Sequence, residues 1–135
     1  MSNVLKHYGY LHTIPEVGLE EVKTSAYLAE QLEQAGFKVT RNVGGATGVI
    51  GVYDSGMEGP TLALRADMDA LGHVIDGVPC ARHTCGHDAH SSMVLSAAEE
   101  IIREKIVNKG RLKILFQPAE EIAAGALTMI AGGAI

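Results

Sequence analysis

The 135-residue chain has the length of one ordinary domain, and 47% of its residues are hydrophobic, enough to build a core. Its net charge of −5 comes without a basic run, which argues against nucleic acid or a membrane surface as partner and favours a small molecule. The start of the chain lacks a secretory apolar stretch, and the longest apolar run, residues 122–135, is too short to span a bilayer. We therefore expect a soluble, cytoplasmic protein in which Cys80 and Cys85 are free thiols or metal thiolates.

Two helices are expected at the start of the chain. Apolar residues recur at intervals of three and four across residues 3–12, which predicts a short amphipathic helix with His7 and His12 on its surface. A stronger helix is predicted across residues 20–35, with Gly36 placed to end it. The apolar side chains expected to face inward from this second helix are Val22, Ala26, Ala29 and Leu32.

Three strands should follow the second helix. Residues 37–40 begin the first, and the β-branched run at residues 48–53 predicts the second. Residues 61–66 predict the third, after a short polar connection that contains glycine. We therefore expect the second and third strands to be antiparallel neighbours.

The second half of the chain begins with a segment, residues 67–88, that shows little periodicity and predicts a loop carrying a functional site. A helix across residues 89–105 and a strand at residues 112–116 follow, so a βαβ crossover in a partly parallel sheet is the economical topology. Residues 128–135 predict a last helix. The polar side chains of the expected site loop are Asp67, Asp69, His73, Asp76, Cys80, His83, Cys85 and His87.

Residues 83–90, His-Thr-Cys-Gly-His-Asp-Ala-His, form the densest group of metal-capable side chains in the sequence. Cys85 and His87 are two residues apart, so in an extended segment both can reach one ion, and a thiolate with an imidazole suits zinc. Asp88 could orient the imidazole by a hydrogen bond or cap the helix expected to start at Ala89. The competing interpretation is a solvated loop in which Cys85 is a small buried side chain.

Carboxylates also lie at two predicted strand ends. Glu120 and Glu121 follow the strand at residues 112–116, at the end where open α/β sheets bind ligands. Neighbouring side chains point apart in a non-helical segment, so Glu121 could bind an ion while Glu120 takes a proton from an attacking water in amide hydrolysis. Asp67 and Asp69 could support the ligands through hydrogen bonds or could fix the loop by turn hydrogen bonds.

Four short motifs are spread over nearly the whole chain. They are Leu11-His12-x-x-Pro15-Glu16-x-Gly18-x-Glu20-Glu21, Leu64-Arg65-Ala66-Asp67-Met68-Asp69-Ala70-Leu71, His83-Thr84-Cys85-Gly86-His87-Asp88-Ala89-His90 and Phe116-Gln117-Pro118-Ala119-Glu120-Glu121. In this order the motifs resemble the amidohydrolase branch of the dinuclear zinc metallopeptidases related to aminoacylase. That branch holds the hippurate hydrolases, the N-acyl-amino-acid amidohydrolases and the indoleacetyl-amino-acid hydrolases.

The resemblance implies that Cys85, His87 and Glu121 are metal ligands and that Glu120 is the general base. A complete site would hold two divalent metal ions, zinc or manganese. The implied reaction is hydrolysis of the amide bond of N-acyl or N-aroyl amino acids or small peptides by a metal-activated water. The implied fold is the three-layer α/β/α zinc-exopeptidase-like catalytic domain with a mixed sheet, of which residues 1–135 would form the N-terminal part. The candidates for hydrogen-bonded support of the ligands are Asp67, Asp69 and Asp88.

The sequence also departs from the family's pattern. Family members are longer and carry further histidine ligands and a lid domain beyond the part present here, so we expect this chain alone to be inactive. Residues 72–80 form a shorter loop than usual, and Ile122-Ala123-Ala124 replaces a glycine-rich continuation. These departures leave the acyl group and the amino acid open, and the sequence also leaves homo-oligomerisation open.

Two alternatives compete with the enzyme hypothesis. The chain could be a non-enzymatic binding or regulatory domain with a closed structural zinc site. The ligands of that site would be Cys80, Cys85, His87 and His90. The chain could also bind no metal, because the ligands present are too few to offset the desolvation of an ion. The Glu120-Glu121 pair argues against the structural site, which would not need it.

Overall fold

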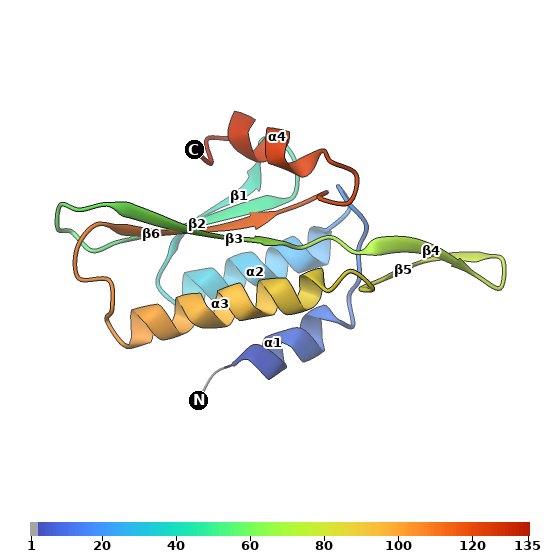
Figure 1. The fold of residues 1–135 in the computed structure, drawn as a ribbon, viewed down its shortest axis with the longest axis horizontal. Helices are drawn as coiled ribbons and strands as arrows, with labels where there is room; N and C mark the ends of the chain where they lie inside the picture. Colours follow the sequence, from blue (N-terminus) through green and yellow to red (C-terminus); the bar gives the residue numbers. More distant parts are fainter. Residues whose placement is uncertain (1–2) are drawn as a thin grey trace.

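The computed structural model describes residues 3–135 and shows a mixed four-stranded sheet between two layers of helices (Figure 1). In chain order the elements are α1 (Val4–Leu11), α2 (Val22–Gln34), β1 (Lys38–Val43), β2 (Gly48–Asp54), β3 (Thr61–Asp67), β4 (Leu71–Ile75), β5 (Val78–Arg82), α3 (His87–Arg103), β6 (Arg111–Gln117) and α4 (Gly125–Ala131). Helices α1, α2 and α3 lie on one side of the sheet and α4 lies on the other, which confirms the expected α/β/α layering (Figure 1). In the described part of the chain, no helix has the length and apolar character needed to cross a membrane.

The four strands lie in the order β1-β2-β6-β3. β6 is antiparallel to β2 and parallel to β3, and α3 lies between β3 and β6 along the chain. The predicted βαβ crossover is thus confirmed, whereas the expected pairing of β2 with β3 is wrong. The crossover returns the chain to the side of β3 that faces β2, so β6 takes the place between them and hydrogen-bonds both.

The main core lies between the sheet and helices α2 and α3. Its fully buried side chains include Leu28 and Leu32 of α2, Leu95 of α3 and Phe116 of β6. The predicted inward face of α2 is wrong at its start, because Val22 is 67% exposed. Val22 is the first residue of the helix, at the end of the apolar stripe, and the stripe is buried only in the later turns.

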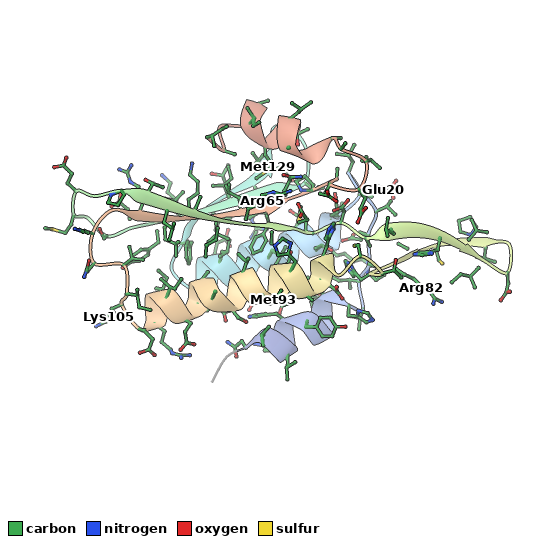
Figure 2. All side chains as sticks on the ribbon, viewed as in Figure 1. Glu20, Arg65, Arg82, Met93, Lys105 and Met129 are labelled. Atoms are coloured by element: carbon green, nitrogen blue, oxygen red, sulfur yellow. The ribbon has the colours of Figure 1, made fainter. Side chains whose placement is uncertain are left out.

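Helix α4 covers the opposite side of the sheet. Met129 packs with Val43 and Ile50 in a second, smaller cluster. Figure 2 shows Met129 on α4 and Met93 on α3 on opposite sides of the sheet. The last helix thus exists as predicted, although it begins and ends earlier, at Gly125–Ala131.

Strands β4 and β5 form a two-stranded hairpin that projects from the end of the sheet (Figure 1). The sequence predicts a loop here, and this prediction is wrong. The many polar residues in this segment favour a loop, although the segment forms two short strands. Asp76 and Gly77 at the turn have φ values of 51° and 78°, as a two-residue hairpin turn requires, and Asp-Gly is the usual sequence for it. The hairpin carries Cys80 and ends at Arg82, three residues before Cys85.

Helix α1 packs against α3 through a buried histidine. His7 is expected at the surface from its sequence but is fully buried. Its ring nitrogens lie 2.8 Å from Tyr27 Oη and 3.0 Å from Glu99 Oε1. The two hydrogen bonds satisfy the imidazole inside the protein, and they join α1 to α2 and α3, which local periodicity does not encode.

Candidate metal centre

Cys85 and His87 lie where the chain enters α3. Gly86, between them, has a φ of 90°, and the helix begins at His87. The segment is therefore a tight bend at the start of a helix, and the expected extended segment with a helix from Ala89 is wrong. Glycine adopts this φ at no steric cost, so Gly86 allows the two neighbouring side chains to approach the same point.

Glu120 and Glu121 lie in the loop that follows β6. β6 ends at Gln117, and Ala119 then turns the chain with a φ of 51°, a region that residues other than glycine rarely adopt. Glu120 Oε2 and Glu121 Oε1 each lie 3.8 Å from His87 Nε2. The loop after β6 and the start of α3 thus meet at the carboxyl ends of the parallel strands, where α/β sheets bind their ligands.

One sulfur, one ring nitrogen and one carboxylate oxygen, from Cys85, His87 and Glu121, lie within 4.8 Å of one another. Among residues 3–135, this is the only group of three or more Cys, His, Asp or Glu side chains whose ligand atoms meet this closely. Thiolate, imidazole and carboxylate all bind zinc, and three protein ligands leave a fourth position for water or substrate. The donor set therefore fits a divalent metal with an open coordination position.

The other side chains of the alternative zinc site lie elsewhere. Cys80 lies in β5 and is paired across the hairpin with His73. His90 Nδ1 lies 3.7 Å from Asp67 Oδ2. In the part of the chain that the structure describes, Cys80 and His90 therefore do not join Cys85 in a closed group of ligands.

Asp69 connects the two sides of the candidate centre and is fully buried. Its Oδ1 and its backbone oxygen each lie 3.1 Å from His87 Nδ1. Its Oδ2 accepts a hydrogen bond of 3.0 Å from the Glu121 backbone N–H. When Nδ1–H donates to Asp69, the Nε2 atom keeps a free lone pair on the side of the glutamates. One carboxylate thus orients the imidazole and also holds the loop of Glu121.

Asp67 and Asp88 make different contacts. Asp67 Oδ1 accepts a hydrogen bond from the Arg65 guanidinium. Asp88 Oδ2 lies 2.6 Å from His12 Nδ1, and α3 has no side-chain hydrogen bond at its N-cap. The carboxylate that meets the His87 ring is that of Asp69.

Burial raises the pKa of the Cys85 thiol, and the nearby Glu121 carboxylate adds to this effect. A divalent cation beside the sulfur favours the thiolate, so metal binding here is coupled to release of a proton. Burial also lowers the pKa of His83, whose two ring nitrogens are buried without a hydrogen-bond partner.

Three side chains have contacts that the sequence does not predict. Glu16 accepts hydrogen bonds at the start of α2, and His12 meets Asp88 at the start of α3. Glu21 is buried and accepts a hydrogen bond from the Ala119 N–H, two residues before Glu121. All three belong to the first motif, which was the only available signal of their importance.

Comparison with known sequences identifies the family. The pattern of "Peptidase family M20/M25/M40" matches residues 63–135, more than half of the chain. The chain is 39% identical over 131 residues to N-acetyl-L-cysteine deacetylase of Bacillus subtilis, and the matched region covers 92% of this chain and 31% of that protein. It is 37% identical over 130 residues to hippurate hydrolase of Campylobacter jejuni, and the matched region covers 91% of this chain and 33% of that protein. The chain thus spans about a third of the length of these relatives.

Solved structures share the fold. The YXEP protein of Bacillus subtilis, described as a dinuclear metal-binding peptidase of the M20 family, has a TM-score of 0.85 and 32% identity, over 98% of this chain and 39% of that one. A protein from methicillin-resistant Staphylococcus aureus has a TM-score of 0.86 and 37% identity, over 97% of this chain and 36% of that one. The resemblance inferred from the four motifs is therefore confirmed, and the chain belongs to peptidase family M20/M25/M40, a family of hydrolases.

Proposed function

We propose that the chain is the N-terminal part of a catalytic domain that hydrolyses the amide bond of N-acyl or N-aroyl amino acids or small peptides. The observation that carries this proposal is the meeting of Cys85, His87 and Glu121 beside Glu120. The relatives support the reaction class, since one is named for deacetylation of N-acetyl-L-cysteine and another for hydrolysis of hippurate.

Cys85, His87 and Glu121 would hold a divalent cation, zinc or manganese. When bound, such a cation lowers the pKa of water and polarises a carbonyl oxygen. The description of YXEP as dinuclear supports two ions in a complete site. The further ligands would come from parts of the enzyme outside this chain, so the 135 residues alone should not hydrolyse hippurate.

We assign Glu120 the role of general base. Its side chain is 42% exposed, whereas that of Glu121 is 26% exposed, so Glu120 lies on the more open side of the group. From this position it can take a proton from the attacking water and deliver it to the leaving amine nitrogen. Glu121, whose backbone N–H donates a hydrogen bond to Asp69, would bind the metal.

Zinc titration of single variants by calorimetry tests the ligand assignment. Replacement of one ligand, in Cys85→Ser, His87→Ala or Glu121→Gln, should weaken zinc binding by about tenfold or more, because one donor of three is lost. Cys80→Ser is the matched control and should leave the affinity unchanged. An equal loss in Cys80→Ser would favour the closed structural site and contradict the proposal.

A further inference from the structure

A buried glutamate from the start of the chain reaches the loop that carries Glu120. Glu21 immediately precedes α2 and is fully buried. Its Oε1 accepts a hydrogen bond of 2.8 Å from the Ala119 backbone N–H, 98 residues away, and its Oε2 accepts one of 2.5 Å from the Thr47 hydroxyl. Figure 2 shows the adjacent Glu20 at the end of the sheet from which the hairpin projects.

Capping of α2 does not explain the Glu21 side chain. The first turn of that helix is served by Glu16, whose carboxylate accepts hydrogen bonds of 3.0 Å from the Lys23 N–H and 2.8 Å from the Thr24 N–H. The Glu21 side chain makes no capping hydrogen bond. Burial of a carboxylate costs free energy unless its oxygens are hydrogen-bonded, and Glu21 directs both of its oxygens to other segments.

Ala119 is the point at which the loop after β6 changes direction. It is fully buried and has a φ of 51°. Its N–H donates to Glu21, and its carbonyl oxygen accepts hydrogen bonds of 3.1 Å and 3.2 Å from the N–H groups of Ala124 and Gly125. Gly18 lies directly against it, since a Cβ added to Gly18 would be 2.9 Å from Ala119 Cα. The segment around Glu21 is thus packed against the turn in the loop.

Two buried carboxylates therefore hold the loop on both sides of Glu120. Glu21 binds the N–H of Ala119, and Asp69 binds the N–H of Glu121 at 3.0 Å. We propose that Glu21 is a positioning residue that acts through the Ala119 backbone and sets the direction in which Glu120 and Glu121 present their carboxylates. The inference rests on the proposed function only for the roles of these two glutamates.

Zinc affinity of three variants of the chain provides the first test. Glu21→Met keeps the side-chain volume but removes both acceptor oxygens, and it should weaken zinc binding by about tenfold, as the loss of a residue that orients a ligand does. Glu21→Gln keeps an oxygen for the Ala119 N–H and should bind zinc nearly as the wild type does. Glu16→Met is the matched control, because it removes a carboxylate that binds two backbone N–H groups outside the loop.

Amide hydrogen exchange measured by NMR without metal provides a second, independent test. The Ala119 and Glu121 amides should exchange faster in Glu21→Met and remain protected in Glu16→Met. Unchanged zinc affinity or unchanged protection in Glu21→Met would overturn the positioning role. If the wild-type chain binds no zinc, the proposed ligand set loses its support, while the exchange rates still decide the role of Glu21.

Circular dichroism shows whether Glu21→Met is folded. If it is not, Glu21→Gln decides the question, because a neutral amide oxygen is a weaker acceptor than a carboxylate. The amide proton resonance of Ala119 should then move upfield in Glu21→Gln relative to the wild type. An unmoved Ala119 resonance would overturn the proposal.

Discussion

Replacement of Asp69 by asparagine should weaken metal binding, although the side chain keeps its size and shape. Both groups that meet its carboxylate are hydrogen-bond donors: His87 Nδ1–H, 3.1 Å from Oδ1, and the Glu121 backbone N–H, 3.0 Å from Oδ2. Asparagine offers one oxygen and one NH₂ group, so one of the two donors must face another donor. Asp69 is fully buried, so bulk water cannot replace the carboxylate oxygen that is lost.

Each orientation of the asparagine amide disturbs one ligand. If the oxygen meets the Glu121 N–H, the NH₂ group faces His87 Nδ1, and Nδ1–H keeps only the Asp69 backbone oxygen, 3.1 Å away, as an acceptor. The ring then loses the carboxylate that orients it and favours the tautomer with a free Nε2 lone pair. If the oxygen meets His87, the loop of Glu121 loses its acceptor. Loss of such an orienting partner typically costs about 10- to 100-fold in metal affinity, which corresponds to about 1.4 to 2.7 kcal/mol.

Competition with a chromophoric chelator at neutral pH measures this loss of zinc affinity. Asp67→Asn is the matched control, because Asp67 lies two residues away but its carboxylate meets Arg65. The control should bind zinc as the wild type does. Wild-type affinity in Asp69→Asn, or an equal loss in Asp67→Asn, would refute the role given to Asp69.

Two further predictions concern carboxylates with different roles. In the full-length enzyme, Glu120→Gln should keep the metal and lower kcat by about 10²- to 10⁴-fold with little change in KM, whereas Glu121→Gln should first lose metal affinity and recover part of its rate in excess metal. Metal titration and initial rates distinguish the two variants. Loss of metal in Glu120→Gln but not in Glu121→Gln would show that Glu120 is the ligand and Glu121 the base. Burial raises the pKa of Glu21 above its ordinary 4.5, so the folded chain holds this proton more tightly than the unfolded chain. The contribution of Glu21 to stability is therefore full below its unfolded pKa and is lost as pH rises through its folded pKa. Urea unfolding at several pH values should show that the free energy of unfolding of the wild type falls relative to that of Glu21→Gln as pH rises. A difference between the two proteins that does not change with pH would contradict this prediction.

Local sequence patterns predict where the helices and strands lie better than they predict which strands pair with each other. The strand at residues 61–66, the helix after it and the strand at residues 112–116 lead correctly to the parallel pair of β3 and β6. The place of β6 between β2 and β3 depends on contacts between distant segments, which no local pattern contains. The Asp76-Gly77 turn was a usable local signal for the hairpin, but the surrounding polar residues favoured a loop.

For the site, sequence patterns show which side chains can bind but not which partners they meet. The motifs single out Cys85 and Glu121, and the structure brings them together. The contact of Glu21 with Ala119 spans 98 residues and could not be derived from spacing. His7 shows the same limit, because an imidazole can be buried wherever distant side chains satisfy both of its nitrogens.

X-ray absorption at the zinc edge of the zinc-loaded chain measures most directly whether Cys85, His87 and Glu121 bind one ion. The expected spectrum has one sulfur at about 2.3 Å and nitrogen or oxygen ligands at about 2.0 to 2.2 Å. The sulfur should disappear in Cys85→Ser and remain in Cys80→Ser. Two sulfur ligands per zinc, or a sulfur that survives in Cys85→Ser, would contradict the proposed centre.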